Sequence, residues 1–242
     1  MALNPHIFRA YDVRGRIGPD INPDVFRQVG RAYASLIRNN GGHHIAVGQD
    51  NRESSAELKA GFIQGARAAG VGVVDIGTVT TPILYFATAH WKLDGGANIT
   101  GSHNPVDYNG VKMVHPGAAP LTEVEIQGLR ETIERGTFTA GAGGLSRRDP
   151  RDEYFDTIAK LVRVERPLKV VADAGNGIAG VYGPPLPDAK APLSMASRSP
   201  WISASLSGAA PGCTIFTPLY STGLWLPVML APPSSFQCAV AK

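Results

Sequence analysis

A serine followed by a histidine and an asparagine is the part of this sequence best suited to chemistry. It lies in the segment Ile99-Thr100-Gly101-Ser102-His103-Asn104-Pro105, at the end of a predicted strand. Gly101 lets the backbone approach a ligand and leaves the serine hydroxyl exposed. His103 can move a proton near neutral pH, and Asn104 can donate a hydrogen bond to an anionic oxygen. These residue types suit a serine that accepts and releases a phosphoryl group. An ordinary polar turn is the alternative interpretation of the same segment.

Two cations elsewhere in the sequence are suited to holding a phosphate beside such a serine. Arg14 precedes Gly15 near the end of a predicted first strand, and Lys112 follows Gly110 a few residues beyond the serine. An arginine can bind a phosphate with two parallel hydrogen bonds, and a lysine acts on it as a point charge. Taken singly, each cation is more simply explained as a solvated surface group. The case for a phosphate site therefore depends on the serine segment and both cations together.

Five segments of the chain extend this pattern. They are Phe-Arg-Ala-Tyr-Asp-Val-Arg-Gly (8–15), Gly-Gln-Asp-Asn-Arg-Glu-Ser-Ser (48–55), Gly-Thr-Val-Thr-Thr-Pro (77–82), Ile-Thr-Gly-Ser-His-Asn-Pro-Val-Asp-Tyr-Asn-Gly-Val-Lys (99–112) and Asp-Ala-Gly-Asn-Gly-Ile-Ala-Gly (173–180). In this order they closely resemble the bacterial phosphomannomutase/phosphoglucomutase branch of the α-D-phosphohexomutase family. The resemblance covers residues 4 to about 186.

The resemblance implies a catalytic role for four residues. Ser102 would be phosphorylated in the resting enzyme and would pass its phosphate to a hexose 1- or 6-phosphate. The resulting hexose 1,6-bisphosphate, the intermediate and activator, would reorient and return its other phosphate. His103 would transfer a proton or contact the phosphate, and Arg14 and Lys112 would stabilise the phosphoserine or take part in acid–base steps.

Further residues of the same motifs receive supporting roles. The resemblance implies that Tyr11 and Asn104 bind substrate in the same pocket. Asp50 and Arg52 also belong to a family motif, and we interpret them as structural residues, with Asp50 shaping the loop. A serine at 54 or 55 is expected to cap the following helix.

The resemblance also implies Mg²⁺, which in the family bridges the serine phosphate and an Asp-Gly-Asp-Gly-Asp-Arg loop. That loop is absent from this sequence, whose only Asp-Gly pair is Asp94-Gly95, and Asp188 is the one acid in the region where the loop should fall. Ser102, through its phosphate, would then be the sole ligand from this chain, and Mg²⁺ prefers several oxygens. The family's sugar-recognition and distal phosphate loops are missing too. We therefore expect this chain to be inactive as a mutase by itself.

Three other patterns compete with this interpretation. The glycines of 175–180 fit the dinucleotide fingerprint, but no acidic residue follows about 20 positions later. Gly101-Ser102 is not the nucleophile elbow of serine hydrolases. His43-His44 and Asp75 are expected to be surface or loop residues rather than metal ligands. A non-catalytic protein that binds sugar phosphates or acts in an interaction remains open as the alternative to an enzyme.

Strand-like and helix-like segments alternate through residues 1–180. Helices are expected at about 22–40, 54–69, 82–91, 122–135 and 151–161, and strands at 6–10, 44–48, 71–76, 96–100, 110–114 and 168–173. This alternation predicts an α/β fold with a mixed, largely parallel sheet sandwiched by helices. The Gly-rich stretch at 140–144 places the domain boundary.

Composition changes abruptly after residue 180. Only four charged residues, Asp188, Lys190, Arg198 and Lys242, lie beyond that point, where prolines become frequent. We predict a phosphoserine domain at 1–145, the start of a second α/β domain at 146–186, and an aberrant or disordered Pro/Ser-rich tail at 187–242. An out-of-frame C-terminus is the favoured explanation, and a disordered tail is the alternative.

The overall composition excludes several classes of protein. The net charge of +3 is small and dispersed, which argues against nucleic-acid binding. No apolar run is long enough to span a bilayer, and no secretory signal is recognised. With only two cysteines, a disulfide framework is excluded, and a reducing cytoplasm is the expected location. A hexose phosphate is the expected partner, while the oligomeric state and the preference for glucose or mannose are not predicted.

Overall fold

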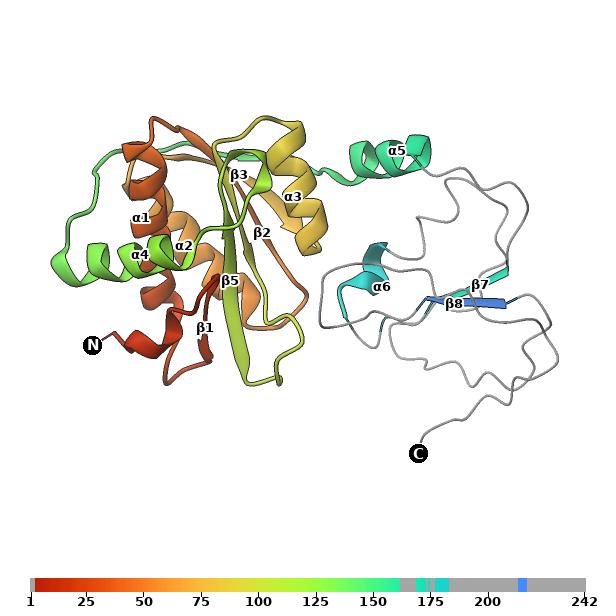
Figure 1. The fold of residues 1–242 in the computed structure, drawn as a ribbon, viewed down its shortest axis with the longest axis horizontal. Helices are drawn as coiled ribbons and strands as arrows, with labels where there is room; N and C mark the ends of the chain where they lie inside the picture. Colours follow the sequence, from red (N-terminus) through yellow and green to blue (C-terminus); the bar gives the residue numbers. More distant parts are fainter. Residues whose placement is uncertain (1–2, 162–168, 173, 175–176, 183–212, 217–242) are drawn as a thin grey trace. The chain divides into compact units, whose positions relative to one another are not determined.

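The computed structural model describes residues 3–161, 169–172, 174, 177–182 and 213–216. The chain divides into two compact units, Met1–Tyr154 and Phe155–Lys242 (Figure 1). The first unit contains the serine segment. The predicted domain limits at 145 and 186 stay predictions.

The first unit is built on a six-stranded sheet with the order β1-β5-β4-β2-β3-β6. Its strands are β1 (Asp12–Arg16), β2 (His44–Gln49), β3 (Gly72–Thr78), β4 (Gly95–Ile99), β5 (Tyr108–Val114) and β6 (Leu145–Arg147). Strands β4, β2, β3 and β6 pair in parallel, and β5 is antiparallel to both of its neighbours. The predicted α/β class with a mixed, largely parallel sheet is confirmed.

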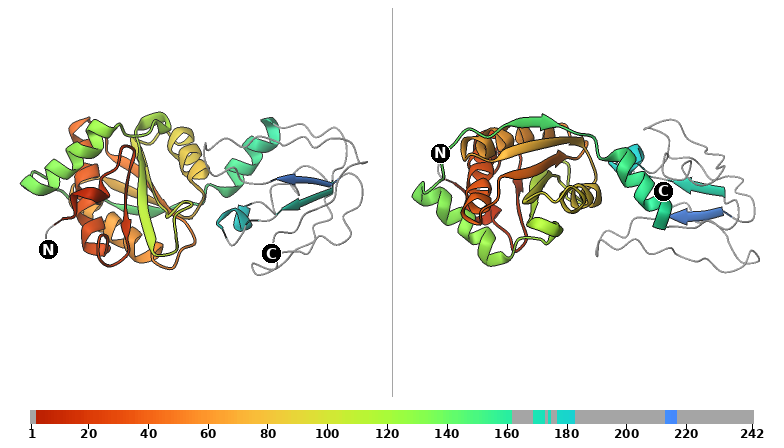
Figure 2. Two further views of the ribbon diagram at one scale, coloured as in Figure 1. Left: turned by 60° about the horizontal axis from the view of Figure 1, so that its bottom comes forward. Right: turned by 90° about the horizontal axis from the view of Figure 1, so that it is seen from above.

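Helices cover both faces of this sheet (Figure 2). They are α1 (Pro23–Asn39), α2 (Ser55–Ala68), α3 (Thr81–His90) and α4 (Glu123–Arg135), with the short 3-10 turns η1 (Pro5–Ile7) and η2 (Pro116–Ala118). Buried side chains of α1, α2 and α4 form one hydrophobic core with the sheet. Helix α3 packs on the other face, where Thr88 Oγ1 and Leu84 approach Gly96 of β4. The serine loop, which joins β4 and β5, thus extends from a sheet that is covered by helices on both faces.

Capping explains where two of the helices begin. Asn22 Oδ1 accepts hydrogen bonds from the backbone N–H groups of Asp24 and Val25, both at 3.0 Å, so the predicted start of α1 is confirmed. Thr122 and Glu125 form a capping box at the start of α4. Ser54 occupies the N-cap position of α2 as expected, but its side chain makes no cap hydrogen bond, so that part of the prediction is wrong.

Three glycines allow helices α1 and α2 to pack backbone against backbone. A Cβ atom at Gly30 would lie 2.2 Å from the carbonyl oxygen of Phe62, and one at Gly65 would lie 1.9 Å from that of Arg27. At Gly61 the carbonyl oxygen of Pro23 is 2.3 Å away. These distances are too short for any side chain, so the close approach of the two helices requires glycine.

The first predicted strand, at 6–10, is wrong. Asn4 Oδ1 accepts a hydrogen bond from His6 N at 3.0 Å and caps η1, in which Pro5 takes the first position. The strand forms later, over Asp12–Arg16. Arg14 therefore lies in the middle of β1, opposite Gly110 of β5, rather than at a strand end.

The remaining elements are α5 (Arg151–Leu161), β7 (Lys169–Ala172), α6 (Ala179–Tyr182) and β8 (Cys213–Phe216). In the second unit β7 and β8 pair in parallel. Most of the predicted tail at 187–242, and two positions of the glycine motif at 175–180, lie outside the described residues. Within the described part of the chain, no helix has the length and apolar character that crossing a membrane requires.

Candidate active site

The serine segment forms the loop between β4 and β5, and its hydroxyl faces outward. Ser102 is exposed and has a backbone φ of 51°, in the left-handed region that favours glycine. Its N–H donates to Thr100 Oγ1 at 3.0 Å, and its Oγ lies 3.3 Å from Nδ1 of His103. The loop therefore holds an accessible hydroxyl next to an imidazole, in a backbone conformation that the surrounding contacts must maintain.

Arg52 supplies most of those contacts. Its Nη1 donates to the carbonyl oxygens of Pro105, at 2.7 Å, and of Tyr108, at 3.0 Å. Its Nη2 donates to those of Asn104, at 2.6 Å, and of Ser102, at 3.3 Å. One guanidinium thus binds four carbonyl oxygens of the loop. This geometry agrees with the structural role expected for Arg52.

Asp50 holds the same loop at its first residue. The carboxylate accepts hydrogen bonds from Gly101 N, at 2.9 Å through Oδ2, and from Arg52 N, at 3.0 Å through Oδ1. The hydroxyl of Ser55 also donates to Asp50, and the buried Asn109 donates from Nδ2 to Ser55 Oγ at 2.9 Å. This buried network joins β2, α2 and β5 beneath the serine loop, so Asp50 shapes the loop as expected.

Arg14 and Lys112 meet at one acid, Asp12. Arg14 Nη2 donates to Asp12 Oδ2 at 2.6 Å, while Lys112 Nζ lies 3.9 Å from the same oxygen. Asp12 and Lys112 are directly opposite each other in the β1–β5 pair. Arg14 Nη1 also donates to Oδ1 of Asn104, at 3.2 Å, and the Asn104 amide donates to Gly101 O at 2.8 Å. The first strand is thereby connected to the serine loop.

The structure therefore brings most of the predicted site residues together. Arg14 and Asn104 are in contact, Ser102 and His103 lie in the loop that contains Asn104, and Lys112 shares an acid with Arg14. Sequence reasoning did not single out Asp12, although its place two residues before Arg14 puts both side chains on one face of the strand.

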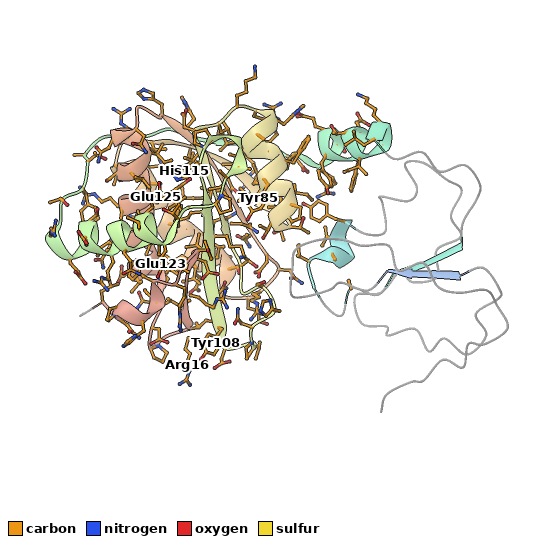
Figure 3. The ribbon with its side chains drawn as sticks, in the orientation of Figure 1. Arg16, Tyr85, Tyr108, His115, Glu123 and Glu125 are labelled. Carbon is orange, nitrogen blue, oxygen red and sulfur yellow. The ribbon has the colours of Figure 1, made fainter. Side chains whose placement is uncertain are left out.

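Two cavities are lined by residues of the predicted site. The arginine cavity, of about 540 Å³, is lined by Arg9, Arg14, Asn104, Pro105 and Tyr108. The tyrosine cavity, of about 310 Å³, is lined by Tyr11, Tyr85, Lys112, Met113, Pro120, Leu121 and Thr122. Figure 3 places Tyr108 beside Arg16, its partner in the β1–β5 pair.

The tyrosine cavity differs from the arginine cavity in its aromatic and apolar lining. Tyr11 is 67% exposed there, and the ammonium group of Lys112 is its cation. Burial raises the pKa of the Tyr85 phenol above its ordinary value. Ser102 and His103 line neither cavity. Arg9 and Tyr85 are lining residues that sequence reasoning missed: Arg9 lies in the motif at 8–15 but was given no role, and Tyr85 lies in none of the five motifs.

The described residues do not fit a magnesium site by themselves. No group of three or more His, Cys, Asp or Glu side chains that could hold a metal occurs among them. Asp12, the acid of the site, is already bound by Arg14 and approached by Lys112. Mg²⁺ prefers several oxygen ligands, so no step of the chemistry is assigned to a metal here.

The histidine pair and Asp75 have structural partners. The backbone N–H groups of His43 and His44 donate to Asp94 Oδ2, at 2.7 and 2.9 Å. The expectation that Asp75 lies at the surface or in a loop is wrong: it is a buried residue of β3, and Lys59 Nζ lies 2.8 Å from its Oδ1.

Comparison with known proteins gives a consistent answer. Residues 5–140 match the family model described as phosphoglucomutase/phosphomannomutase, alpha/beta/alpha domain I. A phosphomannomutase/phosphoglucomutase of Pseudomonas aeruginosa is 42% identical over 187 residues, which are 77% of this chain and 40% of that protein. A phosphoglucomutase of Neisseria meningitidis is 39% identical over 178 residues, which are 73% of this chain and 38% of that protein. The chain thus spans about 40% of the length of these curated relatives.

Solved structures agree with the sequence matches. A phosphoglucomutase/phosphomannomutase family protein from Burkholderia thailandensis superposes with a TM-score of 0.76 at 42% identity, covering 80% of this chain and 44% of that one. A phosphomannomutase-like protein of Thermus thermophilus, at 24% identity and a TM-score of 0.69, covers 78% of this chain and 45% of that one and shows the same fold. The fold, the serine loop and the family model together establish that this chain belongs to the phosphoglucomutase/phosphomannomutase family.

Proposed function

We propose that this chain provides the phosphoserine part of a phosphohexomutase, which interconverts hexose 1-phosphates and 6-phosphates. The observation that carries the proposal is the exposed hydroxyl of Ser102, held on a loop that Arg52 binds at four carbonyl oxygens. Arg14, oriented by Asp12 and bonded to Asn104 of the same loop, supports it with a positive charge. Names of the relatives at about 40% identity agree with this activity.

The proposed transfer needs little covalent help from the protein. The bond between phosphorus and Ser102 Oγ breaks while phosphorus bonds to a hydroxyl oxygen of the bound hexose phosphate. The sugar hydroxyl loses its proton and the serine oxygen gains one. His103 Nδ1, 3.3 Å from Ser102 Oγ, is placed to hold and return that proton. In the reverse direction a hexose 1,6-bisphosphate phosphorylates Ser102, and the same atoms exchange in the opposite order.

The other predicted residues act by binding. Arg14 and Asn104 steady the phosphoryl oxygens, for which a guanidinium has the appropriate geometry. Lys112 and Tyr11 line the tyrosine cavity, where the aromatic ring and the ammonium group suit the ring and the hydroxyl groups of a sugar. Mg²⁺ would supply positive charge to the transfer, and the phosphate on Ser102 is the ligand that the described residues would offer it.

We further propose that the 242-residue chain alone does not complete the mutase reaction, because its sequence lacks the acidic metal loop. A protein that binds sugar phosphates without turnover is the second candidate function, and the same missing loop favours it. We infer a reducing cytoplasm as its location from the use of only two cysteines, and a hexose phosphate as its partner.

Intact mass spectrometry tests the central step. Incubation of the chain with glucose 1,6-bisphosphate should add about 80 Da, one phosphoryl group, to wild type and nothing to S102A. Wild type that binds the bisphosphate but gains no mass supports the binding function instead. Interconversion of glucose 1-phosphate and glucose 6-phosphate by the purified chain would refute the proposal that it is inactive alone.

A further inference from the structure

The two guanidinium groups of the arginine cavity are in different states. Arg14 is engaged, because it donates to Asp12 at 2.6 Å and to Asn104 at 3.2 Å. Arg9 is exposed, and no ion pair or side-chain hydrogen bond of Arg9 occurs within the described part of the chain. A guanidinium has five N–H donors, all of which remain available on Arg9.

The backbone at Arg9 is nevertheless fixed. Arg9 N donates to the carbonyl oxygen of Asp12 at 2.9 Å, and the preceding Phe8 is 5% exposed and forms an antiparallel bridge with Val13. The side chain of Gln127 donates to Phe8 O at 3.4 Å. Because the Cα atom is held in place, a ligand would have to order only the side chain of Arg9, which lowers the entropic cost of binding.

No carboxylate of the described residues forms an ion pair with Arg9. The lining of the cavity, Arg9, Arg14, Asn104, Pro105 and Tyr108, contains no carboxylate. The charge of Arg9 reaches the carboxylate of Asp20. That carboxylate already accepts hydrogen bonds from Asn4 Nδ2 at 2.8 Å and from the backbone N–H of Arg16 at 2.9 Å. Arg9 therefore gives the cavity a positive charge that the carboxylate of Asp20, already hydrogen-bonded elsewhere, offsets only in part.

We propose that Arg9 is a second phosphate-binding residue, which together with Arg14 holds the phosphate group of a hexose monophosphate in the arginine cavity. The inference rests on the proposed function and adds to it a residue and a subsite. A phosphate monoester carries between one and two negative charges at neutral pH, and Asp12 already offsets much of the charge of Arg14. The volume of about 540 Å³ lies within the range of small-molecule sites and leaves room for a sugar ring.

Calorimetric titration of the full chain tests the proposal in the S102A background, in which no phosphoryl transfer can accompany binding. Glucose 1-phosphate and inorganic phosphate are the probes. Replacing Arg9 in R9Q should raise the Kd for both by about tenfold, the loss expected for one charge-assisted contact. R9K keeps the charge but not the bidentate geometry, so its Kd for both probes should lie between those of R9Q and of S102A alone.

The matched control is R27Q. Arg27 is a half-exposed arginine of α1, paired with Asp24 at 2.9 Å and absent from the cavity lining. R27Q should bind both probes as S102A alone does. Equal affinity of R9Q and R27Q, with both melting at the temperature of S102A, would overturn the proposal. So would the absence of any binding heat up to about 10 mM ligand, beyond the millimolar affinity range. Phosphorylation of Ser102 is measured separately by mass, so failure of the proposed function and failure of this subsite give different results.

Discussion

The guanidinium of Arg52 occupies the space in which a side chain at Gly101 would lie. A Cβ atom at position 101 would come within 2.1 Å of Arg52 Nε. The same guanidinium binds four carbonyl oxygens of the serine loop, so it is not free to move aside. The glycine before the serine is thus explained by the residue that holds the loop, in addition to any close approach by a ligand.

This relationship predicts non-additive substitutions. Arg52→Ala should lower the free energy of unfolding by about 2 kcal/mol, because several carbonyl groups lose a charged donor. Gly101→Ala should cost a similar amount by displacing the arginine. Added to Arg52→Ala, Gly101→Ala should cost little more, since the clash is then gone. Urea denaturation of the four proteins measures the cycle, and strict additivity would show that the two residues act independently.

The surroundings of two helical glycines, Gly30 in α1 and Gly128 in α4, predict opposite effects of a change to alanine. Gly30→Ala should destabilise the first unit by about 3 kcal/mol, because the new Cβ meets the backbone oxygen of Phe62 at 2.2 Å. Gly128→Ala in α4 meets nothing within 4 Å and should stabilise it by about 0.5–1 kcal/mol through helix propensity. Thermal melting distinguishes them, and a neutral Gly30→Ala would contradict the packing described.

The backbone of Ser102 predicts an unusual order of stability. At a φ of 51° a residue with a Cβ atom is strained, whereas glycine is not. Ser102→Gly should therefore be more stable than Ser102→Ala by about 1 kcal/mol, although glycine normally loses more entropy on folding. Both variants lack the hydroxyl, so the comparison isolates the backbone. A more stable alanine variant would indicate that the loop relaxes out of the left-handed conformation.

The hydrogen bonds of Glu125 predict that the protein loses part of its free energy of unfolding in acid. Partial burial opposes its ionisation, but hydrogen bonds from His115 and Thr122 outweigh this effect and lower the pKa of its carboxyl group from 4.5 (Figure 3). A carboxyl group with a lowered folded-state pKa stabilises the protein above about pH 4.5, its unfolded value. That contribution is lost as the pH falls through the folded-state pKa.

The melting temperatures at pH 7 and pH 3 test this linkage. Glu125→Gln should lower the melting temperature at pH 7 and should lose less than wild type on acidification. Glu123→Gln removes an exposed acid from the same first turn and keeps the hydrogen bonds of Glu125, so it is the matched control. If the melting temperature fell by the same amount between pH 7 and pH 3 in wild type and in Glu125→Gln, the prediction would be contradicted.

Short segments of the sequence predicted the structure correctly where the interactions that form it are local. The Asn22-Pro23 pair placed the start of α1, because an amide side chain can satisfy the free N–H groups there. The serine loop and its two cations were identified from residue type and motif order. The cause of the helix start lies within a few residues of the chain, whereas the two cations were recognised from the order of motifs that lie far apart in the sequence.

Other features depend on partners distant in the sequence. The segment at 6–10, with Ile7 and Phe8, resembles a strand. The strand β1 instead forms over Asp12–Arg16, where a charged pair faces the site and the alternation of apolar residues is lost. Strand β6 was missed because all three of its residues are exposed, and no burial pattern marks it. Arg9 has the sequence appearance of any surface arginine, and only the cavity distinguishes it.

The acid shared by Arg14 and Lys112 has a consequence for electroneutrality. Two cations and one carboxylate leave a single positive charge in excess, which is less than a phosphoserine dianion requires. Lys112 Nζ lies 3.9 Å from Asp12 Oδ2, so it can turn toward an incoming anion at small cost. Arg14 Nη2, at 2.6 Å from the same oxygen, stays bound to Asp12. Neutrality of the phosphorylated state then calls for one further cation, so the affinity of this chain for a hexose phosphate should depend on whichever positive group completes the balance.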